Sequence, residues 1–126
     1  MRCFADEQPG FPCRVTLEDA SPGEELLLLS FEHHAVSSPY RAAGPIYLRC
    51  EARRPFDATG VCPPVAAHRL LSVRGYDVSG MLRGAELVEG SALAVHLERA
   101  FEDRVVAYIH VHIARPGCFL FAVTRA

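Results

Sequence analysis

The amino-acid sequence predicts an α+β fold: a single domain in which a mainly antiparallel sheet of about seven strands is covered by one helix. Three observations support this prediction. Apolar and polar residues alternate over short segments, as in half-buried strands. Short turn sequences containing Gly separate some of these segments, as in hairpins. One longer segment repeats its apolar residues with the period of a helix. The 126 residues, 50% of them apolar, suit one hydrophobic core and are too few for two ordinary domains.

The predicted strands follow one another closely along the chain. They cover residues 13–18, 25–32, 46–50, 69–78, 81–88, 105–113 and 118–125. Residues 25–32 enclose an unbroken apolar run, which is typical of a central strand. Turns are expected at Ser79-Gly80 and at residues 114–117, whereas residues 33–44 and 52–64 are rich in Pro, Gly and Ser and predict loops. Residues 1–12 are expected to form an irregular N-terminal segment.

The one predicted helix begins near Ser91, a residue type that often caps a helix N-terminus. It extends to about residue 102, and Leu93, Leu97 and Phe101 recur four residues apart. These three side chains would form an apolar stripe that packs against the sheet.

The composition excludes several chemistries. All 13 basic residues are Arg, and the chain contains neither Lys nor Asn. Without Lys there is no Schiff-base lysine and no P-loop lysine, and without Asn there is no Cys-His-Asn triad within the chain. A net charge of −2 argues against a nucleic-acid partner, since non-specific affinity for nucleic acid comes mainly from neutralised phosphates.

The sequence also predicts a cytoplasmic protein without membrane contact. No apolar signal-peptide core follows Met1, and the longest aliphatic run, residues 26–29, is far shorter than a membrane span. None of the five Cys residues is arranged as C-x-x-C, so the thiols are expected to be reduced and without a zinc-ribbon role.

Residues 105–113 are the most informative segment. In a strand, Ile109 and Val111 would face the core, while Tyr108, His110 and His112 would share the opposite face. His110 and His112 are therefore candidate catalytic residues, because only His titrates near neutral pH without perturbation. The alternative is that both rings are half-buried and simply hydrogen-bonded.

Two His residues at i and i+2 lie close enough to hold one metal ion, which makes a mononuclear metal site a third hypothesis. The sequence by itself assigns no metal; if an ion binds, His110 and His112 are its expected ligands. A third ligand would come from Cys118, from His33, His34 or His68, or from a carboxylate. A type II turn at Pro116-Gly117 would place Arg115 opposite Cys118 and Cys118 on the side of Val111 and Ile113, whereas a one-residue bulge would reverse this.

Other polar side chains suggest a ligand pocket on the same face. Arg74 and Tyr76 lie two residues apart on one predicted strand, and an Arg fork commonly binds a carboxylate or phosphate. Tyr40 lies in the Ser-Pro loop that would cover this face, and Tyr108 belongs to the face itself. The leading hypothesis is a pocket that binds a small anionic molecule, either for binding alone or for catalysis, with Cys118 as a candidate reactive thiol and with its cofactor unidentified. The alternative is a non-catalytic interaction module or homodimer, with Phe119, Phe121 and Val123 as one apolar face.

Four groups of residues together resemble a known family. These are Cys13-Arg14 with Leu17-Glu18-Asp19; Ser38-Pro39-Tyr40 with Gly44-Pro45-Ile46; Arg74-Gly75-Tyr76-Asp77; and His110-Val111-His112-Ile113-Ala114 with Gly117-Cys118-Phe119. In this order they resemble a family of small, uncharacterised bacterial proteins known only as a domain of unknown function. The resemblance implies one domain over nearly the whole chain and no particular activity.

Overall fold

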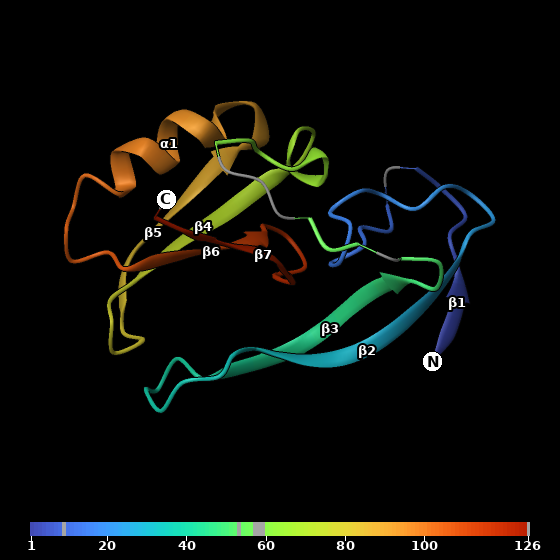
Figure 1. The fold of residues 1–126 in the computed structure, drawn as a ribbon, viewed down its shortest axis with the longest axis horizontal. Coiled ribbons are helices and arrows are strands. Elements are labelled where there is room, and N and C mark those ends of the chain that lie inside the picture. Colours follow the sequence, from blue (N-terminus) through green and yellow to red (C-terminus); the bar gives the residue numbers. More distant parts are fainter. Residues whose placement is uncertain (9, 53, 57–59, 126) are drawn as a thin grey trace.

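The computed structural model describes residues 1–8, 10–52, 54–56 and 60–125. Within them the chain forms two antiparallel sheets (Figure 1). The first contains β1 (Arg2–Phe4), β2 (Glu25–His34) and β3 (Ala42–Arg49), in the order β1-β2-β3. The second contains β4 (Leu70–Tyr76), β5 (Leu82–Glu89), β6 (Tyr108–Ile113) and β7 (Phe119–Thr124), in the order β5-β4-β6-β7. The predicted class is confirmed, with the strands divided between two sheets.

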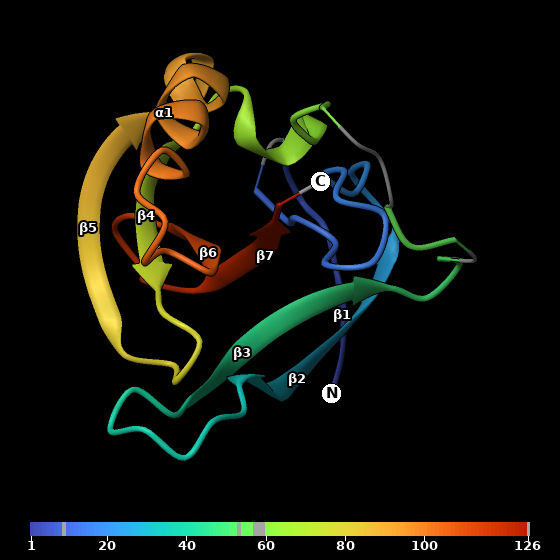
Figure 2. The ribbon, with the colours of Figure 1, turned by 60° about the vertical axis from the view of Figure 1, so that its left-hand side comes forward.

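Helix α1 (Leu93–Ala100) covers one face of the four-stranded sheet (Figure 2). Short 3-10 turns occupy Pro64–Ala66 and Gly90–Ala92. Leu93 is fully buried in the main core, and Leu97 and Phe101 pack against that core, as their spacing predicts. The sheet contributes Leu71, Val73, Ile109 and Val111 to the same core, among others. None of the helices in the described ranges has the length and apolar composition needed to cross a membrane.

The three-stranded sheet lies against the opposite face of β6 and β7. Figure 2 shows β2 and β3 crossing beneath these strands, and the ring of Phe31 at the end of β2 lies 6.1 Å from that of Phe119. Strand β6 is consequently buried on both of its faces from Ile109 to His112. Its central position in the molecule is what places its histidines away from solvent.

The hairpin at Ser79-Gly80 and the strand over residues 25–32 are confirmed, and β2 is the central strand of its sheet. Other predictions were wrong. Residues 13–18 form a turn, closed by bonds from the Cys13 N–H to the Glu18 carbonyl and from the Leu17 N–H to the Cys13 carbonyl. Cys13 and Leu17 are both buried, four residues apart, so the apparent alternation reflects two core anchors within a turn. Leu17 even adopts a φ of 53° to reach the core.

The structure also differs from the prediction in the N-terminal segment and at the start of the helix. Within residues 1–12, which the sequence suggests are irregular, Arg2–Phe4 pairs with the edge of β2. Ser91 lies in the 3-10 turn before α1, and the capping position is Ala92, without a side-chain hydrogen bond. The five cysteines are free thiols, as predicted, although only Cys13 is fully buried.

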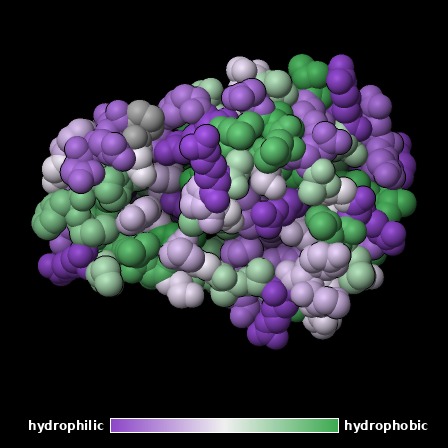
Figure 3. All heavy atoms as spheres, turned by 180° about the vertical axis from the view of Figure 1, so that it is seen from behind, coloured by the Kyte–Doolittle hydropathy of each residue, from purple (hydrophilic) through white to green (hydrophobic). Residues whose placement is uncertain are grey.

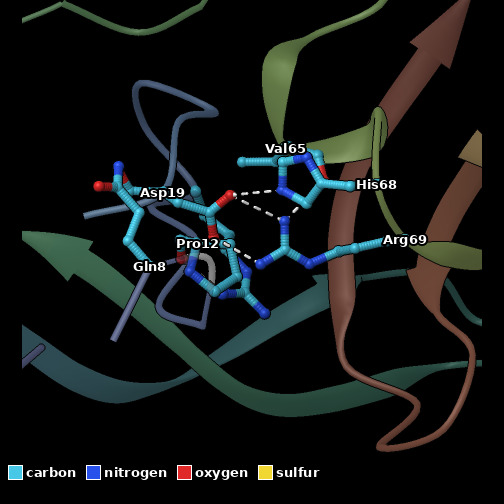
Figure 4. Close-up of polar contacts among 7 residues, drawn as sticks. Gln8, Pro12, Asp19, Val65, His68 and Arg69 are labelled. Atoms are coloured by element: carbon cyan, nitrogen blue, oxygen red, sulfur yellow. Dashed lines mark hydrogen bonds and ion pairs between the residues drawn. The ribbon is translucent and has the colours of Figure 1, made fainter. Parts of the chain in front are cut away.

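A buried ion pair connects residues 10–20 to the start of β4 (Figure 4). The carboxylate of Asp19 lies between the His68 ring and the Arg69 guanidinium, accepting hydrogen bonds from Arg69 Nη2 at 2.5 Å and from His68 Nε2 at 3.2 Å. The side chains of Asp19 and Arg69 are 6% and 10% exposed. Burial raises the pKa of Asp19, but the hydrogen bonds from Arg69 and His68 outweigh it and hold the pKa below its usual value.

We expect Arg69→Gln to lower the free energy of unfolding by about 3 kcal/mol, because it leaves a buried carboxylate without its main partner. Urea unfolding followed by circular dichroism measures this. Arg41→Gln is the control, since Arg41 pairs with Glu32 on the surface, and its cost should stay below about 1 kcal/mol. The difference between wild type and Arg69→Gln should shrink as the pH falls below about 4, where protonation of Asp19 removes the pair. Equal costs for the two variants would contradict a structural role of the buried pair.

Candidate functional site

A polar stripe crosses β4 and β6 on the face of the sheet opposite α1. Strand pairing places Arg74 beside His110, Ser72 beside His112 and Tyr76 beside Tyr108. Directly paired residues share a face, so the stripe is a consequence of alternation on two neighbouring strands. The structure thus brings together five of the residues that the sequence singles out: Arg74, Tyr76, Tyr108, His110 and His112.

The end of β2 adds two histidines to this stripe. The pairing of β2 with β3 shifts register between Phe31 and His34, and such a bulge changes the direction in which neighbouring side chains project. Both His33 and His34 contact the rings of β6: the centroid of His33 lies 5.1 Å from that of His112, and the centroid of His34 lies 5.0 Å from that of His110. The sequence offers His33 and His34 only among several distant alternatives, since nothing local shows that β2 lies over β6.

His34 has a structural role that accounts for both of its ring nitrogens. Nδ1 lies 2.7 Å from the Tyr40 carbonyl oxygen, to which it donates, and Nε2 then accepts from the Tyr108 hydroxyl at 2.6 Å. Burial raises the pKa of Tyr108 and of Tyr76, so both hydroxyls stay protonated at neutral pH. Tyr40 contributes its backbone carbonyl to the site by accepting the hydrogen bond from His34. The centroid of its ring lies 6.3 Å from that of Tyr76.

The other histidines of the cluster are His33, His110 and His112. Each has a buried ring nitrogen without a hydrogen-bond partner among the described residues. Among the described residues, four buried side-chain nitrogen or oxygen atoms lack a hydrogen bond: Nδ1 of His33, Nδ1 of His110, Nε2 of His112 and Oγ1 of Thr16. His112 donates from Nδ1 to the Gly117 carbonyl at 2.8 Å, which leaves a lone pair on its Nε2. One potential ligand atom from each of His33, His110 and His112 lies within 4.8 Å of the other two.

These three rings are neutral at physiological pH. Burial lowers the pKa of His110 to about 3 and that of His112 to about 4, and burial also lowers the pKa of His33. The positive charge of Arg74 acts in the same direction, as would a proton on a neighbouring histidine, although a hydrogen bond with Gly117 partly opposes the shift at His112. The interactions that shift these three pKa values include no carboxylate. The cluster therefore presents neutral imidazole, the form that binds metals.

Cys118 is not a member of this group. The turn before it is longer than the type II turn that the sequence suggests: the Ile113 N–H donates to the Cys118 carbonyl, so Ile113 rather than Arg115 pairs with Cys118. Cys118 is half-buried, and the carbonyl of its neighbour Phe119 accepts a hydrogen bond from Arg14 Nε at 3.0 Å.

A bulge in β7 divides the apolar residues that the sequence assigns to one face. Val111 pairs with Phe121 and His112 with Phe119, so Leu120 is the extra residue. Phe119 stacks on His33 at 5.1 Å, whereas Phe121 is buried in the core on the α1 side and Val123 packs against that core. Phe119, Phe121 and Val123 therefore do not form a shared outer face for a homodimer. Seen from behind in Figure 3, hydrophobic residues form separate groups among hydrophilic ones.

Two hollows in the surface lie away from the histidines. One of about 720 Å³ lies between α1 and β7, and its lining includes Leu17, Phe56, Leu97 and Phe101. A smaller one of about 200 Å³ lies beside Asp19 and His68. Neither is lined by His110 or His112, and the side chains of both histidines are buried between the sheets.

Comparison with known proteins identifies the family and no activity. A family model described as "Protein of unknown function (DUF1203)" matches residues 10–125. The chain therefore belongs to this family, in agreement with the resemblance of its motifs. No curated protein and no solved structure matches.

We expect His110 and His112 to stay neutral in the metal-free protein between pH 5.5 and 8, because their lowered pKa values lie near 3 and 4. Proton–carbon NMR of the ring C–H groups, assigned with His110→Gln and His112→Gln, measures this directly. The resonances of both rings should keep one position across the range. A titration midpoint near 6.5 for either ring would contradict the closed, desolvated cluster.

Proposed function

We propose that the protein binds one divalent transition-metal ion, zinc in the first instance, through His33, His110 and His112. The observation that carries the proposal is the convergence of three histidine rings, each of which also has a buried nitrogen without a hydrogen-bond partner among the described residues. Buried polar atoms are normally paired, because an unpaired one costs about 1–3 kcal/mol. A metal ion would satisfy all three nitrogens at once.

His34 supports this reading by contrast. It is buried like His110 and His112, at 2% exposure, and both of its nitrogens have protein partners. A purely structural role for His33, His110 and His112 would require comparable partners, and the described residues offer none to the three nitrogens. The strand that carries two of these residues is thus arranged for a ligand that the protein itself does not supply.

The geometry suits zinc after a small contraction. With Zn–N bonds of about 2.0–2.1 Å, tetrahedral ligands lie about 3.3 Å from one another. One ring nitrogen from each of the three histidines already lies within 4.8 Å of the other two, so modest ring rotations would bring three nitrogens onto one ion. Neutral imidazoles suit Zn, Cu, Fe and Ni, and three histidines with one open position are the ligand set of some catalytic zinc sites.

The surroundings also resemble those of metal-binding histidines elsewhere. A ligand His commonly donates its second ring N–H to a carbonyl or carboxylate, which fixes the ring and its tautomer. His112 donates in this way to the Gly117 carbonyl. The potential ligand group in the described residues contains no fourth His, Cys or carboxylate, so the fourth position is left for water or an added ligand.

This proposal changes the roles suggested for the two strand histidines. A general acid or base works best with a pKa near the working pH, whereas the pKa of His110 is about 3 and that of His112 about 4. Both are better suited to hold an ion than to exchange protons. Any acid–base chemistry would then fall to a metal-bound water, whose pKa a zinc ion can lower to about 7.

We expect metal-free protein, prepared without a histidine tag, to bind one equivalent of Co²⁺ or Zn²⁺. Cobalt absorption and isothermal titration would measure the binding. His33→Gln, His110→Leu and His112→Gln should each weaken it by about 100-fold or more, since each removes one of three ligands. His68→Gln and His96→Gln serve as matched controls and should leave the affinity unchanged. A variant that combines the three substitutions should bind neither ion. If it binds Co²⁺ or Zn²⁺ as tightly as wild type, the proposal is overturned.

His110→Leu also separates a binding role from a structural one. In the metal-free state this variant should be at least as stable as wild type, because it replaces an unpaired buried nitrogen with apolar atoms of similar volume. With excess zinc, only wild type should gain in melting temperature. A large loss of stability in metal-free His110→Leu would instead show that the ring is required for packing.

A further inference from the structure

We infer that the metal site binds a small oxyanion, a carboxylate or phosphate group held between the ion and the guanidinium of Arg74. This inference rests on the proposed metal site and adds the class of its ligand. It is carried by the balance of charge around the three histidines and by the position and bonding of Arg74.

Arg74 differs from the other partly buried arginines. Arg69 pairs with Asp19 and Arg49 pairs with Glu24, while Arg14 donates to the backbone carbonyls of Pro12 and Phe119. None of the ion pairs found within the described ranges includes Arg74. Its Nε donates to Ser72 Oγ at 3.2 Å, and its side chain also bonds to that of Tyr76. A half-buried guanidinium without a carboxylate is thus held in place by two hydroxyl groups.

The charge at the site requires an anion. The electrostatic partners that act on His33, His110 and His112 are one another, His34 and Arg74, and none is acidic. A divalent ion on three neutral imidazoles keeps its full charge of about +2, and Arg74 adds one more beside it. Positive charges so close together and so poorly solvated are costly unless an anion compensates them. Hydroxide would neutralise part of this charge, whereas an oxyanion can contact the ion and the guanidinium together.

The position of Arg74 also suggests how a ligand arrives. Arg74 pairs with His110 on one side and with Ala85 of β5 on the other. On that outer side, Ala85 and Leu87 of the same sheet face are exposed, while Ser72 and Arg74 are half-buried. Arg74 therefore lies at the boundary between the closed histidine cluster and an open part of the sheet. An anion approaching over β5 meets its guanidinium before the metal.

The chemistry of the two partners defines the ligand class. The planar guanidinium presents parallel N–H donors that match two oxygens of a carboxylate or phosphate. The open position of a three-histidine zinc site accepts an oxygen ligand. Together they favour a small molecule that carries one such group and disfavour neutral or cationic molecules.

The test uses the full chain loaded with Co²⁺, whose visible absorption reports on the ligands of the ion. Sodium acetate and sodium phosphate are titrated separately, and sodium chloride at equal ionic strength is the control. We expect at least one oxyanion to shift the spectrum at concentrations at least tenfold below those at which chloride does. Acetate and phosphate distinguish a carboxylate ligand from a phosphate ligand.

Arg74→Gln provides the decisive variant. It should weaken the binding of that oxyanion by about tenfold or more, because a charge-assisted hydrogen bond is worth about 1.5–3 kcal/mol. The same variant should bind Co²⁺ as tightly as wild type or more tightly, since it removes a like charge from beside the ion. A merely structural role for Arg74 predicts losses in both affinities. Arg104→Gln, an exposed arginine outside the site, is the matched control and should change neither.

The outcomes separate the two proposals. Suppose that wild type binds Co²⁺, but that neither oxyanion shifts the spectrum at a lower concentration than chloride does. The oxyanion inference is then wrong and the metal site stands. If an oxyanion binds equally well to wild type and to Arg74→Gln, the assignment to Arg74 is wrong. If wild type binds no Co²⁺, the metal proposal fails, and the inference that rests on it fails with it.

Discussion

The burial of β6 on both faces is the constraint on which the rest of the structure depends. A strand in a sheet packed only on one side can leave its alternate residues in water, but β6 lies between α1 and the three-stranded sheet. One face carries Ile109 and Val111 into the hydrophobic core, and the other carries polar rings into a second interior. The apolar face provides the free energy that holds the sheet together, and the polar face can then be given over to binding.

This division also determines how each side of the strand responds to its environment. The apolar side is satisfied by packing alone, whereas the histidine side holds buried nitrogens that none of the described residues satisfies. Such a cluster is a local cost that the remainder of the fold must offset, as is common at functional sites. A ligand that binds only the folded state would recover part of that cost, and the stability of the domain would then depend on ligand concentration. Folding and binding are expected to be coupled in this protein.

Local patterns predicted most of the fold and two of the three histidines in the cluster of His33, His110 and His112. The period-two pattern placed Tyr108, His110 and His112 on one face of β6, and Gly-containing turns located both hairpins, because these features depend on neighbours in the chain. The same patterns failed at residues 13–18, where Cys13 and Leu17 anchor a turn, and at Ser91, which precedes the helix without capping it. His33 reaches the site through the packing of one sheet on another, which no local pattern contains. Arg74 was recognisable as an anion-binding residue type, whereas the absence of an acidic partner for it among the described residues could be learned only from the folded structure.

The bulge at Leu120 has a consequence for comparing this chain with its relatives. Because Leu120 is the extra residue between Phe119 and Phe121, a chain that lacks it would pair residue 119 with His112 in a regular ladder. The aromatic ring stacked on His33 would keep its place, and the core side of β7 would lose one leucine. A single-residue gap at this position in an alignment is therefore compatible with an intact histidine cluster. A gap of two residues would turn the residues at the start of β7 toward the opposite faces of the sheet. The length of this segment in a related chain would therefore indicate whether the histidine cluster is preserved in it.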